Sequence, residues 1–299
     1  MILLRLALRE PAGLHTYRVA GVDLGSDVPL PALEPFATPL ALPAGLPPFP
    51  LGFEETGAVV FQGNAPLGSR ERRVEALAGE GGTRVRVDEE AFVLSSDGSR
   101  VWRVEGPEGA DPDGEVVLGP VLSLALALRG VFCLHAAAVA VGGVAIALAG
   151  DSGAGKSTLA TLLAEEGWLR AADDILPVDG GPEGIAACPR FPQLKLAAAE
   201  QPGSRLPERL PLAAVYLLKQ RSHGVRASLL RPVQAIAHLV RQTVAARLFA
   251  PDLLVRHADF CAHVVGRVPV RELAYPRERD IGPLVRAAIA ADLHLEGAA

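Results

Sequence analysis

The stretch that decides the fold reads Gly150-Asp151-Ser152-Gly153-Ala154-Gly155-Lys156-Ser157-Thr158. It matches the pattern G-x-x-x-x-G-K-[ST] at every fixed position. Its glycines permit backbone angles that other residues avoid, so successive N–H groups can point inward at phosphate oxygens. The chain has only three lysines, and one of them stands here, where a slim point charge suits a phosphate. All nine residues are predicted to hold the phosphates of a nucleoside triphosphate.

The surroundings of this loop fit the same interpretation. An apolar strand over residues 144–148 enters the loop, and a helix with Leu159, Leu162 and Leu163 on one face leaves it and ends at Gly167. In this setting Lys156 reaches the β and γ phosphates, and the Ser157 hydroxyl ligates Mg²⁺. The alternative is a chance glycine turn, for which neither the preceding strand nor the following helix would be expected.

Two adjacent acidic residues follow the next expected strand, at residues 169–172. A carboxylate at the carboxyl end of a neighbouring strand faces the ligand crevice of an open α/β sheet. Asp173 and Asp174 are therefore candidates for holding Mg²⁺ and for accepting a proton from an attacking hydroxyl. The alternative role is a helix N-cap or a solvated turn, where Asp is common.

Other candidate residues have weaker support from the sequence. His135 lies in the strand one hairpin before the loop, and a His among apolar residues is more often a hydrogen-bonded core residue than a catalyst. Arg190, Lys195 and Arg241 could each bring positive charge to a transferring phosphoryl group, or could equally lie on the surface.

The two parts of the chain differ in pattern. Short β-rich segments bounded by turn residues predict strands at residues 16–19, 58–61, 83–87, 91–94 and 100–104. The proline-rich residues 29–50 predict an extended surface loop, and residues 106–114 predict a domain boundary. We therefore expect a β-rich N-terminal domain over residues 1–112 and a catalytic domain over residues 113–299.

From residue 116 onward, strands alternate with helices, as in α/β domains. Residues 120–128 predict a buried helix, and the apolar residues 131–150 predict two buried strands around a Gly142-Gly143 turn rather than a membrane span. Pro232 is expected to start a helix that carries Val233, Ile236, Val240 and Val244. A strand over residues 268–273 and a helix over residues 281–293 complete the expected fold.

Composition excludes several classes of protein. Hydrophobic residues make up 49% and charged residues 21%, which is typical of a globular chain. A net charge of −5 without a long basic run gives no electrostatic basis for binding nucleic acid or an anionic membrane. Three cysteines without metal-ligand spacing suit a reducing compartment, and the start of the chain lacks a signal peptide pattern, so we expect a cytoplasmic protein.

The quoted residues resemble a known family. Leu134-His135-Ala-Ala-Ala-Val-Ala-Val, the glycine loop and Ala172-Asp173-Asp174 resemble the catalytic domain of HPr kinase/phosphorylase. The chain is more similar to the shorter HPr-kinase-like serine kinases found with peptide-modification genes, through three further stretches. These are Gly21-Val-Asp-Leu-Gly-Ser-Asp-Val-Pro-Leu-Pro, Phe191-Pro-Gln-Leu-Lys195-Leu and Val268-Pro-Val-Arg-Glu-Leu-Ala-Tyr-Pro-Arg.

The resemblance implies an α/β fold with a P-loop kinase core of the HPr kinase and phosphoenolpyruvate carboxykinase type. It also implies that His135 is an active-site residue associated with the acidic pair, and it hints at homo-oligomers. Residues 180–196 lack the Glu-Val-Arg-Gly-type signature of true HPr kinases. The resemblance therefore does not extend to activity on HPr itself, to phosphorolysis or to a further metal-binding Glu.

The sequence thus predicts an ATP-dependent kinase that uses Mg²⁺ and transfers the γ-phosphate to a serine of a peptide or small protein, such as a ribosomal precursor peptide. Catalysis is assigned to Asp173, Asp174, His135 and Lys156, and metal binding to Ser157, Asp173 and Asp174. Alternatives are a nucleotide-dependent regulatory ATPase and a kinase of a small hydroxylated metabolite. The sequence leaves open which aspartate is the base, and whether GTP replaces ATP.

Overall fold

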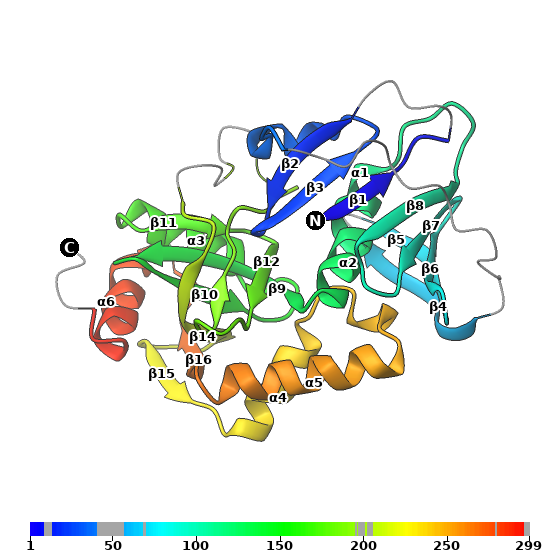
Figure 1. Ribbon diagram of the computed structural model, residues 1–299. Helices are drawn as coiled ribbons and strands as arrows, with labels where there is room; N and C mark the ends of the chain where they lie inside the picture. The colour runs from blue at the N-terminus through cyan, green and yellow to red at the C-terminus, as the bar shows by residue number, and fades with distance from the viewer. Residues whose placement is uncertain are drawn as a thin grey trace. The chain divides into compact units, whose positions relative to one another are not determined.

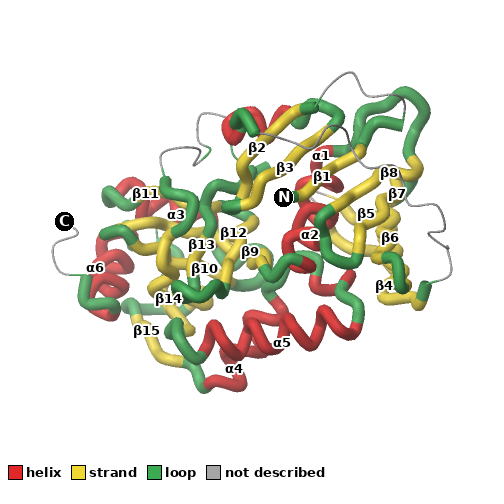
Figure 2. The backbone as a smooth tube through the Cα atoms, viewed as in Figure 1, coloured by secondary structure: helices red, strands yellow, loops and turns green. Residues whose placement is uncertain are grey.

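The computed structural model describes residues 1–8, 14–40, 57–67, 70–194, 196, 201, 206–278 and 280–295 (Figure 1). The chain forms two compact units. The first comprises Met1–Val131 and Val244–Arg256, and the second comprises Phe132–Thr243 and His257–Ala299. Both contain sheet and helix, so the mixed α/β class predicted from the sequence is confirmed (Figure 2). The division into domains of residues 1–112 and 113–299 stays a prediction, because compactness does not test independent folding.

The first unit is built on an eight-stranded sheet in the order β2-β3-β1-β8-β7-β6-β5-β4. β1 runs parallel to β3 and β8, and the other pairs are antiparallel. The strands are β1 (Ile2–Arg5), β2 (His15–Val19), β3 (Val22–Ser26), β4 (Ala58–Leu67), β5 (Arg70–Gly79), β6 (Gly82–Val87), β7 (Glu90–Ser95) and β8 (Arg100–Glu105). All five strands predicted in this region are confirmed, whereas β1, β3 and β5 were not predicted.

The prediction of an extended loop over the proline-rich segment is wrong at residues 31–36, whereas residues 29–30 and 38–40 have no regular secondary structure. Pro31–Phe36 form a 3-10 helix, η1, with a proline at its first position. Leu33 and Phe36 are buried, because the helix turns these two apolar side chains into the core. Residues 41–50 of the same prediction lie outside the described residues.

The helical connection after the sheet begins at α1 (Gly114–Val116) and continues through a π-helical turn, η2 (Val117–Val121), into α2 (Leu122–Leu128). The predicted buried helix at residues 120–128 is confirmed, with an earlier start. Pro120 lies in the wider turn, where its missing N–H costs less than in a regular α-helix.

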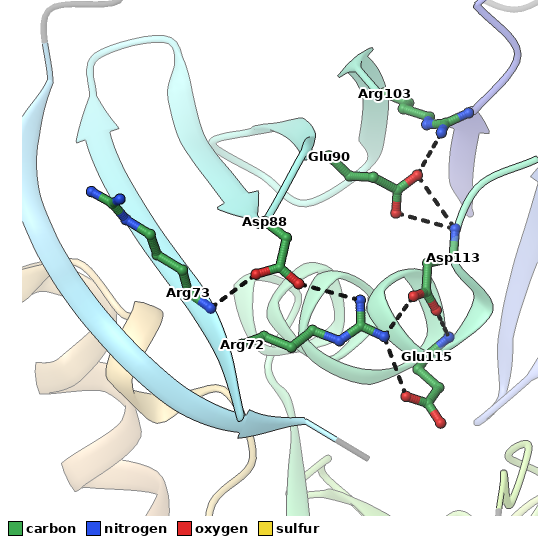
Figure 3. A network of polar contacts seen from close by, with 7 residues as sticks. All are labelled: Arg72, Arg73, Asp88, Glu90, Arg103, Asp113 and Glu115. Carbon is green, nitrogen blue, oxygen red and sulfur yellow. Dashed lines mark hydrogen bonds and ion pairs between the residues drawn. The ribbon is translucent and has the colours of Figure 1, made fainter. Parts of the chain in front are cut away.

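A buried ion network holds the start of this connection (Figure 3). The Asp113 side chain caps α1 by accepting from the Glu115 backbone N–H at 2.9 Å, and it pairs with Arg72 at 2.6 Å. Glu90 accepts from the Asp113 backbone N–H at 3.1 Å and pairs with Arg103 at 2.5 Å. The buried charges of Arg72 and Arg103 are thereby paired with carboxylates. The same contacts fix the start of the helix to β5, β7 and β8.

The second unit has a sheet in the order β10-β9-β12-β13-β14-β16-β15, and β10 also pairs with β14. β10, β14 and β16 are parallel, and β9 is antiparallel to β10. The strands are β9 (Val131–Val141), β10 (Val144–Ala149), β11 (Leu169–Ala172), β12 (Ile175–Asp179), β13 (Ala186–Ala187), β14 (Leu210–Gln220), β15 (Arg226–Leu229) and β16 (Val270–Tyr275).

Helices cover both faces of this sheet. Alternate residues of β9 and β10 contribute to two separate apolar clusters, as the two-residue period of a strand requires. One cluster includes α4 (Pro232–Arg241) and α5 (Pro251–Val265), and the other includes α3 (Lys156–Glu165) and α6 (Gly282–Asp292). The sheet is therefore buried on both sides, which explains the near-continuous apolar run from residue 131 to 149.

The second unit corrects one helix face and excludes one alternative. In α4 the fully buried residues are Ala235 and Leu239, while Val233 is 80% exposed. The predicted face is confirmed at Ile236 and Val240, which are half-buried and pack against the core, and it is wrong at Val233; Val244 lies beyond the end of the helix. Residues 131–149 form a hairpin, and within the described residues no helix has the length and apolar character needed to cross a membrane.

Candidate functional site

The glycine loop (residues 150–158) leaves the carboxyl end of β10 and leads into α3. Gly150, Gly153 and Gly155 have φ values of 149°, 76° and 92°. Only glycine reaches such angles without strain, so the three residues allow a tight turn around the start of the helix. The residues predicted for phosphate binding therefore lie where a helix begins and its N–H groups are unpaired by the helix itself.

Lys156 lies within the curl of this loop. Its Nζ donates to the backbone oxygen of Gly150 at 2.8 Å and to that of Asp151 at 3.3 Å. The side chain is 8% exposed, although it carries a charge. Ser157 and Thr158 stand next to it at the exposed first turn of α3. The ammonium group is thus held against the first two residues of the loop, and two hydroxyl-bearing residues follow the lysine in the chain.

The strand register brings His135 to the same end of the sheet. β9 and β10 pair from Val144 with Val141 to Ala149 with Ala136. Continued by one residue, the same register sets Gly150, which follows β10, opposite His135 of β9. The His135 backbone N–H donates to the Gln242 oxygen at 2.6 Å, which fixes its strand at this point.

The acidic pair follows β11, which pairs with the other side of β9. The two neighbouring carboxylates have different surroundings. Asp173 is 5% exposed and pairs with Arg170 at 2.6 Å, whereas Asp174 is 22% exposed and lies 3.4 Å from the His135 Nδ1. Since consecutive side chains diverge, one carboxylate is neutralised inside the fold and the other faces the histidine.

Two arginines from other parts of the second unit contact the glycine loop. Arg241, at the end of α4, pairs with Asp151 at 3.1 Å, and both side chains are exposed. Arg277, which follows β16, donates to the Gly153 oxygen at 2.7 Å. The predicted candidate Arg190 instead pairs with Glu208 at 3.7 Å, and Lys195 lies outside the described residues.

Two polar residues near the site were not identified from the sequence. Gln193 accepts hydrogen bonds from the backbone N–H groups of Asp173 and Asp174. Tyr275 lies close to Gly155, so that a Cβ added there would stand 3.5 Å from its hydroxyl, and burial raises the pKa of this tyrosine. No sequence motif marks a glutamine or a tyrosine for a position near the glycine loop or the acidic pair, because only the folding of the chain brings these residues there.

The comparisons with known proteins give a limited result. No family model matches the chain, and no curated protein matches it. Among solved structures, the chain is similar to the HPr(Ser) kinase/phosphatase from Coxiella burnetii, with a TM-score of 0.33 and 13% identity. That match covers 55% of this chain and 93% of the other. A likeness of this strength establishes no activity for this chain.

Proposed function

We propose that this chain is a kinase that binds Mg²⁺ and ATP on the glycine loop and transfers the γ-phosphate to a hydroxyl group. One observation carries the proposal. A loop with three positive-φ glycines and a buried lysine lies at the same end of the sheet as a histidine–aspartate pair. Phosphate binding and proton removal are the two tasks of such an enzyme, and this edge of the sheet offers residues for both.

The loop suits a triphosphate. Its glycine angles favour N–H groups that converge on an anion, and the positive end of α3 adds to their attraction. Lys156 donates to two neutral carbonyl oxygens in this structure. Charged phosphate oxygens are stronger acceptors than carbonyls, so they would compete for the same ammonium group.

Oxygen ligands for Mg²⁺ are at hand in the Ser157 hydroxyl, with an acidic-pair carboxylate as a further candidate. Bound there, the ion would neutralise charge on the β and γ phosphates. Within the described residues, no group of three or more His, Cys, Asp or Glu side chains forms a metal site by itself. The phosphates would supply the other ligands, as is usual for a nucleotide-bound Mg²⁺.

Asp174 is the better candidate for the base. Asp173 is buried and its charge is engaged by Arg170, so moving a proton onto it would break an ion pair. Asp174 is more exposed and stands 3.4 Å from the His135 Nδ1, so it can take up a proton without breaking the buried Arg170–Asp173 pair. We therefore assign proton acceptance to Asp174, orientation to His135 and charge stabilisation to Lys156.

The acceptor we propose is a serine hydroxyl in a peptide or small protein, in line with the resemblance of the loop and the acidic pair to HPr-kinase-like serine kinases. A cytoplasmic location and association into homo-oligomers belong to the same proposal. Two other acceptors suit the same site chemically. Water would make the chain a regulatory ATPase, and a small alcohol would make it a metabolite kinase.

The test is transfer of label from γ-labelled ATP, with Mg²⁺, into a peptide and small-protein fraction of the source cell. Lys156→Ala and Asp174→Asn proteins run beside the parent, and Asp259→Asn, an exposed carboxylate on α5, serves as the control. We expect label on serine with the parent and the control, and at least about a hundredfold less with the two site variants. Phosphate release that no acceptor changes would favour the ATPase instead.

A further inference from the structure

Gln193 connects the acidic pair to the rest of the second unit through one buried amide. Its side-chain oxygen accepts from the backbone N–H of Asp173 at 2.8 Å and from that of Asp174 at 3.1 Å. Its side-chain nitrogen donates to the backbone oxygens of Ile175 at 2.9 Å and Phe191 at 3.1 Å. The residue is 1% exposed.

This pattern uses the full capacity of an amide. A glutamine side chain offers two acceptor positions on oxygen and two donor hydrogens on nitrogen, and all four are engaged here. The partners also determine its orientation, because backbone N–H groups can meet only the oxygen and carbonyl groups only the nitrogen. A fully bonded, buried amide has one arrangement, and it holds its four partners in one geometry.

We infer that Gln193 is a positioning residue for the acidic pair, an inference that rests on the proposed function. Asp173 and Asp174 are adjacent, yet one side chain turns to Arg170 and the other to His135. Consecutive side chains diverge by themselves, but both partners are kept only if the backbone of the two residues is held in place. Gln193 fixes it by bonding both N–H groups to a single oxygen, so that Asp174 is presented to His135 while Asp173 stays buried.

Gln201 offers a matched control from the same segment. Its side chain accepts from the Gln193 backbone N–H at 2.9 Å and donates to the Gln193 backbone oxygen at 2.7 Å and to the Leu196 oxygen at 3.1 Å. It thus secures the main chain around Gln193 through bonds that do not include the acidic pair. Replacing it should weaken the segment and leave the bonds from Gln193 to Asp173 and Asp174 in place.

The experiment compares Gln193→Met, Gln201→Met, Asp174→Asn and the Gln193→Met/Asp174→Asn double variant with the parent full-length chain. The rate of phosphate release or transfer from γ-labelled Mg·ATP is measured, together with binding of ADP in EDTA. We expect Gln193→Met to lower the rate at least tenfold with ADP affinity within threefold of the parent, and Gln201→Met to lower it less than threefold. In the Asp174→Asn background, Gln193→Met should change the rate less than threefold, because both changes remove the same contribution.

Equal effects of the two glutamine variants, or additive effects in the double variant, would overturn the inference and leave Gln193 a general structural residue. A parent that neither binds nor turns over ATP would instead refute the proposed function. Should Gln193→Met fail to fold, hydrogen exchange of the parent decides. The Asp173 and Asp174 amides should then exchange at least tenfold more slowly than the amide of exposed Ser152, and rapid exchange at both would overturn the inference.

Discussion

Gly155 has a φ of 92° immediately before the first residue of α3, and its neighbour Lys156 is buried although charged. The two residues depend on each other. The left-handed angle turns the chain into the helix, and this turn places the lysine inside the loop, where its ammonium group meets the Gly150 and Asp151 oxygens. A side chain at Gly155 would therefore disturb the loop through the backbone rather than through contact.

Gly155→Ala should lower the free energy of unfolding by about 1–2 kcal/mol, since an alanine is strained in the left-handed region. It should also weaken ATP binding by about tenfold, because the strain is relieved by a change of loop conformation. Thermal unfolding and titration with a fluorescent nucleotide measure the two effects. Gly167→Ala is the control, since Gly167 has a φ of 93° at the other end of α3 and should cost stability alone. Equal loss of affinity in both variants would contradict this account.

His257 is a titratable residue with a role in packing, unlike Lys156, to which we assign a role in phosphate binding. It is 1% exposed, and its Nε2 lies 2.8 Å from the Thr243 hydroxyl oxygen. Because the Thr243 hydroxyl donates its proton to the Leu239 oxygen, we assign the ring proton to Nε2, which then donates to Thr243. Burial lowers the pKa of the ring below its ordinary value of 6.5. Burial also raises the pKa of the neighbouring Cys261 thiol to about 12, so the thiol stays neutral near pH 7.

The lowered pKa of His257 predicts a loss of stability in mild acid. Below pH 6.5 the unfolded chain binds a proton at this ring while the folded chain does not, so unfolding is favoured as the pH falls towards the folded pKa. The melting temperature of the parent should therefore fall between pH 7.5 and pH 5.5. In His257→Gln the fall should be smaller, although the variant is less stable at pH 7.5. An unchanged pH slope in the variant would show that other groups are responsible.

At the scale of elements, the ends of four segments meet the glycine loop or the acidic pair. β10 and β16 are parallel to β14 and pair with its two sides. Arg277, which follows β16, donates to the Gly153 oxygen of the loop that follows β10. The antiparallel β9 brings His135, and β11 brings the acidic pair. Parallel strands end at the same edge of a sheet, which is why Gly153 and Arg277 come together although they are 124 positions apart in the chain.

Arg277 should contribute to nucleotide binding through the loop. Its guanidinium donates to the Gly153 oxygen of the loop, so Arg277→Ala should weaken ATP binding about three- to tenfold by loosening the loop. The melting temperature should change little, since the residue is exposed. Titration of ATP against this variant and against Arg226→Ala, an exposed arginine on β15, measures the effect. Equal ATP affinity in the two variants would show that the Arg277 hydrogen bond does not stabilise the loop for nucleotide binding.

At the scale of the whole molecule, each unit has its own means of enclosing charge and apolar surface. The second unit buries its sheet between two helical layers, whereas the first unit ties its helical connection to the sheet through the ion network of Figure 3. In that network Arg103 and Glu90 are nearly fully buried. Buried pairs of this kind add little when intact, but an unpaired member is costly.

Arg103→Met should therefore lower the free energy of unfolding of the first unit by about 3–5 kcal/mol, because it leaves the Glu90 charge buried without its partner. The Arg103→Met/Glu90→Gln double variant should recover part of this loss, since no unpaired charge remains. The chain has two tryptophans, so denaturation in a Trp168→Phe background follows Trp102 of the first unit alone. A double variant that is less stable than Arg103→Met would contradict this explanation.

Much of the architecture around the loop could be predicted, because it is encoded by neighbours in the chain. Glycine spacing, apolar runs and helix ends gave the β9–β10 hairpin, α3 and its end at Gly167. Elements without a strong local pattern were not predicted, among them β5, β14 and α5. The face of α4 was predicted only in part, because the sheet it packs on is assembled from distant segments and apolar spacing alone does not specify that Ala235 is covered and Val233 is not.

The sequence by itself determined the glycine loop, its flanking strand and helix, the acidic pair and the α/β class. These depend on backbone freedom and on periodicity, which act within a few residues. Only the tertiary structure decided that Asp173 pairs with Arg170 and Asp174 with His135, and that Gln193 accepts from the Asp173 N–H and Arg277 donates to the Gly153 oxygen. Such contacts depend on strand register and on the desolvation of each polar group, and these are fixed only when segments far apart in the chain pack together.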